Sequence, residues 1–196
     1  MTAVTETVYQ IFHDRKMADK AIQQVLKSNK KWGSRDRAFI AENSYELVRW
    51  WRLLHYINET RTDNLHPNTI MRLLGILLRM KGIELPEWTE FKGLSRSHIK
   101  FRYDEAQKIR KVKESIPDWL DQLGAEELGE RWDATLKALN QTAPLTIRIN
   151  TLKTNYNQLA KDLLPKGVRL MPIADLPDAA RVEERSNLFA LPEFKE

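Results

Sequence analysis

The stretch PLTIRINTLK, residues 144–153, decides how this chain is expected to fold. Apolar and polar residues alternate along it: Leu145, Ile147 and Ile149 with Thr146, Arg148 and Asn150. A period of two is typical of a half-buried β-strand. Since no earlier part of the chain has a clear strand pattern, the sequence predicts a change of architecture here. The polar face would present Arg148 beside Asn150, with Lys153 a turn further on.

The chain before this strand has the apolar spacing of helices. Apolar residues recur every three or four positions in the longer predicted helices, at 4–26, 34–55, 67–82 and 125–139. Shorter helices are predicted at 104–113 and 117–124, while 83–103 is expected to be a connector. Five or six such helices predict a compact, mainly α bundle over residues 1–140.

The chain after the strand predicts a small α/β subdomain over residues 141–196. Asn155 can cap a helix that ends near Pro165, and a second strand is predicted at 168–173. Short strands are expected near 181–183 and 188–190. A strand–helix–strand order favours a parallel first pair of strands.

The composition excludes several classes of chemistry. The 196 residues include no Cys, so disulfides, thiolate metal sites and thiol nucleophiles are excluded. The four His are never four positions apart, and no metal site is predicted. The N-terminus lacks the pattern of a secretory signal and the apolar runs are too short for a membrane span. We therefore expect a soluble, cytoplasmic chain without membrane association.

The net charge of +5 is mild, but positive charge is concentrated in the predicted helices. Five basic residues lie within 27–37 against one acid, Asp36, and eight lie within 92–113 against two acids. The first group surrounds a helix start, where backbone N–H groups also favour a phosphate. Its candidate RNA-binding residues are Lys30, Lys31, Arg35 and Arg37. The alternative is a solvated helix end that Asp36 partly neutralises.

The polar face of the predicted strand supplies three further candidates, Arg148, Asn150 and Lys153. A guanidinium and an amide side by side suit phosphate, ribose or base edges. The alternative is structural, with Arg148 paired to a local carboxylate and Asn150 capping the following turn.

No catalytic or cofactor-binding residue is predicted. The seven glycines are scattered without a G-x-G turn after a strand, the arrangement that lets the backbone approach a cofactor closely. No nucleophile elbow of the G-x-S-x-G type is present either.

Five motifs carry a family resemblance. They are KWGSRDRAFIAENSYELVRWW (31–51), SIPDWL (115–120), GERW (129–132), APLTIRINTLKT (143–154) and LFALPEFKE (188–196). In this order and spacing they resemble the N-terminal region of the Nop/Sun family of RNA (cytosine-5) methyltransferases. The bacterial enzymes that methylate ribosomal RNA are the most similar members.

The resemblance implies a helical bundle like that of transcription antitermination factors, followed by the α/β subdomain. It implies that this bundle binds ribosomal or transfer RNA. It also implies a downstream methyltransferase domain, missing here, that uses S-adenosylmethionine and a Cys that adds to the cytosine ring. These 196 residues alone are therefore expected to be inactive and to bind no cofactor. Two alternatives stay open. One is a stand-alone helical RNA-binding or antitermination-like module without activity, and the other is a protein adaptor that docks through exposed Trp residues.

Overall fold

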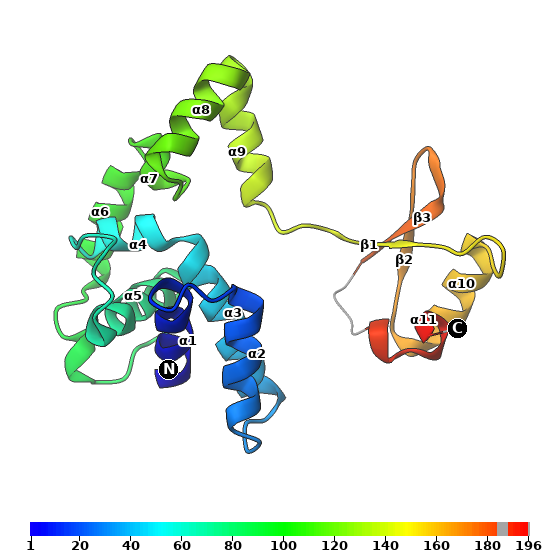
Figure 1. Cartoon of the computed structure of the whole chain (residues 1–196), viewed down its shortest axis with the longest axis horizontal. Coiled ribbons are helices and arrows are strands. Elements are labelled where there is room, and N and C mark those ends of the chain that lie inside the picture. Colours follow the sequence, from blue (N-terminus) through cyan, green and yellow to red (C-terminus); the bar gives the residue numbers. More distant parts are fainter. Residues whose placement is uncertain (184–187, 196) are drawn as a thin grey trace. The chain divides into compact units, whose positions relative to one another are not determined.

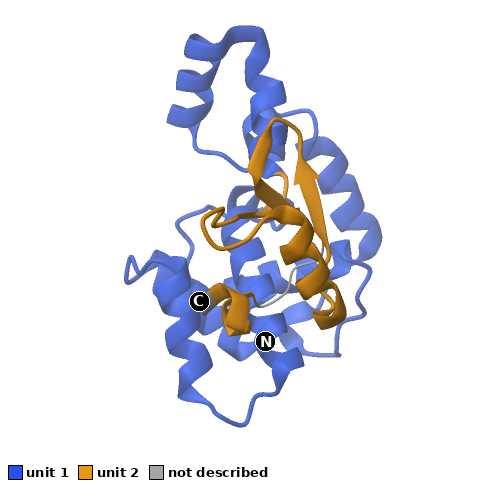
Figure 2. Cartoon of the chain, turned by 90° about the vertical axis from the view of Figure 1, so that its right-hand side faces the viewer, with its two compact units in different colours: residues 1–140 blue, residues 141–196 orange. Residues whose placement is uncertain are grey.

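The computed structural model describes residues 1–183 and 188–195 of the chain (Figure 1). The chain divides into two compact units, residues 1–140 and 141–196 (Figure 2). Each unit has its own hydrophobic core and is described by itself. Within the described residues, no helix combines the length and apolar character that a membrane span requires.

The first unit is entirely helical. Its elements are α1 Thr2–Phe12, α2 Ala18–Ser28, α3 Ser34–Arg49, α4 Trp51–Ile57, α5 Pro67–Met80, η1 Thr89–Phe91, α6 Arg96–Ala106, α7 Arg110–Lys113, α8 Asp118–Leu128, η2 Gly129–Arg131 and α9 Trp132–Asn140. The predicted helical bundle is thus confirmed. Its likeness to antitermination factors stays a prediction.

Helix α5 is the centre of the main core. Six of its apolar side chains are at most 4% exposed: Ile70, Leu73, Leu74, Ile76, Leu77 and Leu78. A helix with apolar residues on most of its circumference must be enclosed by other elements. Helices α1, α3, α4 and α6 all contact it. Gly75 lets η1 approach closely, because a Cβ there would lie 2.7 Å from the Phe91 ring.

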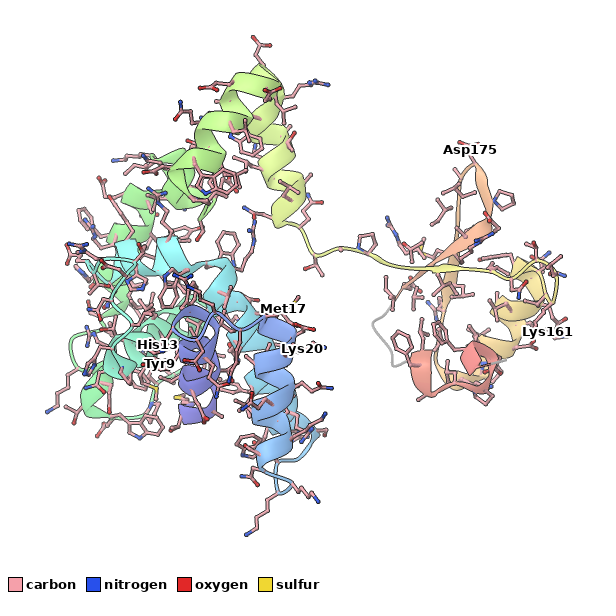
Figure 3. The ribbon with its side chains drawn as sticks, in the orientation of Figure 1. Tyr9, His13, Met17, Lys20, Lys161 and Asp175 are labelled. Atoms are coloured by element: carbon pink, nitrogen blue, oxygen red, sulfur yellow. The ribbon has the colours of Figure 1, made fainter. Side chains whose placement is uncertain are left out.

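The single helix predicted at 4–26 is two helices, which is a correction to the sequence-based prediction. Helix α1 ends at Phe12, where His13 stacks on Tyr9 with ring centroids 4.6 Å apart (Figure 3). Arg15 has a φ of 54°, in the left-handed region that α-helices exclude. The chain therefore turns before α2, and α1 packs against α2 and α3.

The helix predicted at 34–55 is also divided, at Trp50. Trp50 has φ −100° and ψ 21°, which separates α3 from α4. The adjacent Trp51 is buried and stacks on Phe12 at a centroid distance of 4.1 Å, while Trp50 is only partly buried. Two neighbouring indoles thus point in different directions, as their spacing predicts.

The connector predicted at 83–103 is wrong from Arg96 onward, and the single helix predicted at 104–113 is instead the end of α6 and the short α7. Helix α6 begins at Arg96 inside the predicted connector, and the Ser95 hydroxyl caps it by accepting from the His98 N–H at 3.2 Å. It ends at Ala106, and only the short α7 follows. The buried Ile99 and Ala106 fix the face of α6 that meets the bundle.

Helices α8 and α9 form an antiparallel pair with a small core of its own. Its buried members are Ile116, Trp132 and Leu136. Gly124 of α8 faces the Trp132 indole, and its ideal Cβ would lie 2.2 Å from Cε2 of that ring. The Trp132 N–H donates to the Asp121 carboxylate at 3.0 Å, which fixes the ring in place.

The second unit is a three-stranded sheet with helices. Its elements are β1 Leu145–Arg148, α10 Tyr156–Leu163, η3 Leu164–Lys166, β2 Leu170–Ile173, β3 Leu176–Val182, η4 Leu188–Ala190 and α11 Pro192–Lys195. The strand order is β1-β3-β2, and β3 runs antiparallel to both neighbours. The core contains Ile149, Leu163, Leu170, Ala180 and Val182 among its buried residues.

The predicted α/β pattern of this unit needs two corrections. The expected parallel pair is not formed, because β3 returns through a tight turn at Asp175 and inserts between β1 and β2. The strand expected at 188–190 is the 3₁₀ helix η4. The short strand predicted near 181–183 is longer and begins at Leu176.

We expect Gly124→Ala to destabilise the α8–α9 pair. Alanine would gain about 1 kcal/mol of helix propensity, but its methyl group overlaps an indole that cannot move freely. Overpacking of this kind costs about 1–3 kcal/mol, so the net change should be a loss. Urea unfolding followed through the Trp132 indole NMR signal measures it. The exposed Gln122→Ala on the same helix is the control and should change stability by less than about 0.5 kcal/mol.

A second prediction concerns His55, whose ring is fully buried with Nδ1 2.8 Å from the Thr60 hydroxyl. Burial lowers the pKa of His55 from 6.5 to about 4. Between these values the unfolded chain binds a proton that the folded chain does not. The free energy of unfolding should therefore fall as pH drops from 6.5 to 4, by on the order of 3 kcal/mol, and level off below.

Chemical denaturation at a series of pH values tests this. His55→Gln keeps a hydrogen-bonding group for Thr60 and should remove that part of the pH dependence. The exposed His98→Gln is the control for replacing a histidine as such, and at pH 7 it should change stability by less than about 0.5 kcal/mol. Equal pH profiles for wild type and His55→Gln would contradict the prediction.

Candidate nucleic-acid interface

Three of the predicted RNA-binding residues form an exposed basic group between α2 and α3. Lys30 and Lys31 lie in the turn that joins the helices, and Arg35 lies in the first turn of α3. All three side chains are exposed, and none takes part in an ion pair with another described residue. We call Lys30, Lys31 and Arg35 the α2–α3 basic group.

Arg37 has a structural contact instead. Its Nη1 donates to the Leu26 carbonyl oxygen at 3.0 Å, and the residue is only partly exposed. The bond ties the first turn of α3 to the last turn of α2, where a helix has unpaired carbonyls. Asp36 also serves the helix start, because its carboxylate accepts from the Gly33 N–H at 3.2 Å. Arg37 is thus less available to a ligand than the α2–α3 basic group.

The second basic segment, residues 92–113, is largely neutralised within the fold. Arg96 pairs with Glu84, Lys108 with Glu105, and Arg102 lies over the Tyr56 ring. These contacts place each cation beside a partner in its own unit, which lowers the charge offered to an external phosphate. A count of basic residues along the sequence therefore overestimates the positive charge that this segment offers to a ligand.

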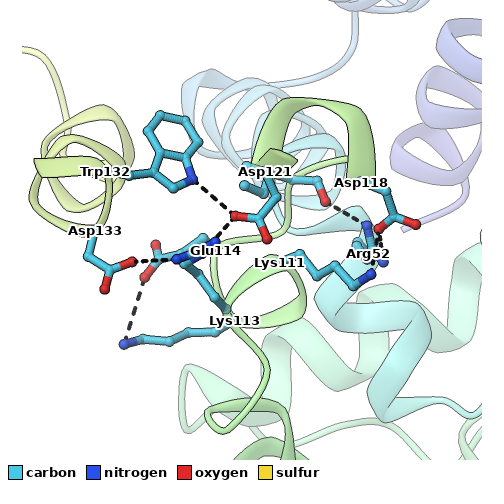
Figure 4. Close-up of polar contacts among 10 residues, drawn as sticks. Arg52, Lys111, Lys113, Glu114, Asp118, Asp121, Trp132 and Asp133 are labelled. Carbon is cyan, nitrogen blue, oxygen red and sulfur yellow. Dashed lines mark hydrogen bonds and ion pairs between the residues drawn. The ribbon is translucent and has the colours of Figure 1, made fainter. Parts of the chain in front are cut away.

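Figure 4 shows the ion pairs and hydrogen bonds that the last residues of this segment form with neighbouring helices. Asp118 lies 2.7 Å from Arg52 and 3.0 Å from Lys111, joining α4, α7 and α8. Hydrogen bonds from Arg52 and Lys111 lower the pKa of Asp118 below its usual range. Arg110 similarly contacts Asp121 at 2.7 Å. The cluster holds short helices together and is better suited to structure than to recognition.

In the second unit, strand alternation places the predicted residues as expected. Arg148 lies on the exposed face of β1, and its side chain is 87% exposed. Its Nε is 3.6 Å from Asp178 Oδ2, a loose surface ion pair. The structural alternative for Arg148 is therefore present, but it leaves the guanidinium accessible to solvent.

Asn150 closes the turn that follows β1. Its side-chain oxygen accepts from the Leu152 N–H at 3.2 Å, and its carbonyl accepts from the backbone N–H groups of Lys153 and Thr154. The structural alternative thus also holds for Asn150. The turn carries the exposed Lys153, so Arg148 and Lys153 flank an Asn that shapes the backbone between them.

A groove of about 570 Å³ lies next to these residues within the second unit. It is lined by Ile147, Arg148, Ile149, Asn150, Lys153, Thr154, Gln158, Leu159, Asp162, Leu163, Leu188, Leu191, Glu193 and Phe194. Apolar side chains such as Leu159 and Leu191 and polar ones such as Gln158 and Asp162 both line it. The sequence-based prediction missed this groove, although the spacing of Leu188, Leu191 and Phe194 marks a short helical face that contributes to it.

Within the described ranges 1–183 and 188–195, no three His, Asp or Glu side chains come together as metal ligands. What the exposed basic groups can do is bind phosphate by charge and hydrogen bonds.

Residues 116–188 match the family model described as "Methyltr_RsmF/B-like, ferredoxin-like domain". The match begins at Ile116 and so includes α8 and α9 as well as the sheet.

Relatives extend the similarity over most of the chain. "Ribosomal RNA small subunit methyltransferase B" of Shigella boydii serotype 18 is 22% identical over 218 residues, covering 93% of this chain and 51% of the relative. The Escherichia coli K12 protein of the same name is 32% identical over 80 residues. This match covers 41% of this chain and 19% of that protein. The chain thus spans about half the length of the first of these curated relatives.

A solved structure supports the fold. The crystal structure of PH0851 matches with a TM-score of 0.62 and 15% identity, covering 98% of this chain and 50% of that one. At this identity the likeness concerns the fold alone. Taken with the family match and the relatives, it confirms the resemblance drawn from the motifs: the chain contains a region like the N-terminal part of the Nop/Sun RNA methyltransferases.

Proposed function

We propose that the chain is the RNA-binding N-terminal portion of an S-adenosylmethionine-dependent ribosomal RNA cytosine-5 methyltransferase. The observation that carries the proposal is the similarity to ribosomal RNA methyltransferases over 93% of the chain. That similarity gives RNA as the partner, and the exposed basic residues give a physical means of holding it. The localisation consistent with this role is the cytoplasm.

The methyl transfer itself is assigned to another part of the enzyme. S-adenosylmethionine would supply the methyl group, and a Cys would activate the cytosine. Among the described glycines with positive φ, none sits in a turn that leads from a strand into a helix: Gly82, Gly93, Gly129 and Gly167. The residues present therefore do not fit the cofactor, and we derive no catalytic step from them.

Within this proposal the α2–α3 basic group is the main phosphate contact of the bundle. Its three cations are exposed and unpaired among the described residues, so a phosphate would not have to displace an internal partner. Arg37 supports the same surface by holding the start of α3 against α2. Arg148 and Lys153 would supply a second contact in the other unit.

We expect the triple variant Lys30→Ala, Lys31→Ala, Arg35→Ala to weaken RNA binding for all sequences alike. Removing one phosphate contact should flatten the slope of log affinity against log salt by roughly 0.7–0.9. Fluorescence anisotropy with a ribosomal RNA hairpin at several salt concentrations measures both effects. The fold should be unchanged, because these side chains have no ion-pair partner among the described residues.

Three cations from the α6–α7 segment give a matched control: Arg96, Lys108 and Arg110, each already in an ion pair. Their replacement by Ala changes the net charge equally but should alter the salt slope less. An equal fall in affinity in both triple variants would show that only net charge matters. That result would remove the α2–α3 basic group as a specific contact.

For Arg148→Ala we expect little change in stability and a clear change in RNA binding. An exposed ion pair contributes about 0–1 kcal/mol to folding. Without the guanidinium, RNA binding should weaken by about 1–3 kcal/mol in the full-length enzyme. Arg169→Ala is the control, because Arg169 is also exposed and pairs with Glu183 at 3.3 Å in the same unit. Equal RNA affinities for the two variants would limit Arg148 to its surface ion pair.

A further inference from the structure

The first unit contains a pocket of about 370 Å³ that the phosphate contacts proposed above do not use. It lies where α4, the turn after α4 and α7 meet, and most of its lining side chains carry hydrogen-bonding groups. Pockets of roughly 300–1,000 Å³ are typical of small-molecule sites. The lining residues that matter here are Arg52, His55, Thr60, Arg61, Asp63 and Val112.

The turn after α4 is held in one conformation by contacts with that helix. The Thr60 N–H donates to the His55 carbonyl oxygen at 3.0 Å, and the Trp51 indole N–H donates to the Thr62 carbonyl oxygen at 3.0 Å. Between them Glu59 has a φ of 55°, which residues other than glycine seldom adopt. Because these contacts already fix the turn, it needs little ordering to receive a ligand.

His55 brings an unsatisfied donor to this pocket. Its ring is fully buried, and Nε2 has no hydrogen-bond partner among the described residues, whereas Nδ1 lies 2.8 Å from the Thr60 hydroxyl. That hydroxyl accepts from Asn58 Nδ2 at 3.3 Å, so its own proton is available to Nδ1 and the ring proton is then on Nε2. Buried donors in proteins usually have an acceptor. The ring therefore favours a ligand that brings an oxygen to Nε2.

Arg61 and Asp63 give the solvent side of the pocket one charge of each sign. Their side chains are 86% and 65% exposed, and the Arg61 guanidinium donates to both Asp63 carboxylate oxygens, at 3.1 and 2.6 Å. A guanidinium has five N–H donors and a carboxylate about four acceptor sites, so both groups keep hydrogen-bonding capacity beyond this pair. An anion can therefore bind Arg61 while a hydroxyl of the same ligand donates to Asp63.

Arg52 adds a second guanidinium to the lining. It donates to the Ile116 carbonyl oxygen at 2.7 Å and pairs with Asp118 at 2.7 Å, and these two contacts hold it in place. The lining thus carries two guanidinium groups against one carboxylate, Asp63. This balance disfavours a metal cation and favours an anion that also carries a hydroxyl group. A ribose phosphate has both groups.

We infer that this pocket binds one ribose phosphate unit of an RNA strand. Arg61 and Arg52 contact the phosphate, while the 2′-hydroxyl donates to Asp63 and accepts from His55 Nε2. Val112 of α7 supplies an apolar contact to the sugar. Since DNA lacks the 2′-hydroxyl, the pocket distinguishes RNA from DNA, which the exposed cations of the α2–α3 basic group do not. The inference rests on the proposed RNA-binding function and names a site for it.

The test uses the whole chain with uridine 5′-monophosphate and 2′-deoxyuridine 5′-monophosphate, which differ by this one hydroxyl. In an NMR titration both should shift the amide signals of residues 60–63. The ribonucleotide should bind roughly tenfold more tightly, as expected for one hydrogen bond to a charged group. Asp63→Ala should abolish this preference by weakening the ribonucleotide alone, whereas Arg61→Ala should weaken both nucleotides alike.

Arg96→Ala is the matched control, because Arg96 is also exposed and ion-paired in the same unit but does not line the pocket. It should leave both nucleotide affinities unchanged. The exposed side chains of Arg61 and Asp63 can be removed without opening the core, and unshifted amide signals elsewhere in the bundle would verify the fold. Equal affinity of the wild-type chain for the two nucleotides would overturn the inference. So would an undiminished preference for the ribonucleotide in Asp63→Ala.

A ribosomal RNA hairpin separates this inference from the proposed function. The hairpin should displace uridine 5′-monophosphate from the wild-type chain, and Asp63→Ala should lower its affinity relative to a DNA hairpin of the same sequence. A hairpin that binds by fluorescence anisotropy but leaves the mononucleotide in place would overturn the inference while the proposed function stands. Absence of hairpin binding would contradict the proposed function, and the mononucleotide preference would still decide the chemistry of the pocket.

Discussion

Burial of α5 is the constraint on which the first unit depends. Its apolar side chains point in most directions, so the helix is stable only when neighbours enclose it. The breaks at His13–Met17 and at Trp50 allow the flanking segments to surround it, where one long helix could not curve enough. Gly75 provides the remaining space, since it admits the Phe91 ring against the α5 backbone. The exposed corner between α2 and α3 is therefore held by packing that lies elsewhere in the bundle.

Internal pairing decides which charges remain available to a partner. The segment 92–113 is the more basic in sequence, yet Arg96, Lys108 and Arg110 all have carboxylate partners. Of these pairs, Arg110–Asp121 joins α7 to α8, whereas Lys108–Glu105 is a local pair at the end of α6. The turn before α3 needs no such pairing, because the Asp36 cap and the Arg37 contact already fix it. Its cations are left exposed, and this makes the less basic segment the better candidate for binding RNA.

Strand β1 has three different surfaces in a short stretch of chain. Ile147 and Ile149 pack on the core of the second unit, whereas Arg148 extends into solvent on the opposite face. Residues from Ile147 to Asn150 also line the groove of the second unit. The turn closed by Asn150 fixes where the polar face ends.

The sequence by itself determined the mainly helical character, the alternation of β1 and the cap at Asn155, because these depend on residue spacing and local hydrogen bonds. It also indicated the family, through short motifs whose order could be recognised. Only the tertiary structure decided that β3 inserts between β1 and β2, that Arg37 is a structural contact and that Arg96 and Arg110 are already paired. Each of these depends on residues distant in sequence meeting in space, such as Arg52 with Asp118, or on a backbone path that single-residue propensities do not specify. Local chemistry fixed the elements, and long-range packing selected which of their polar groups stay exposed.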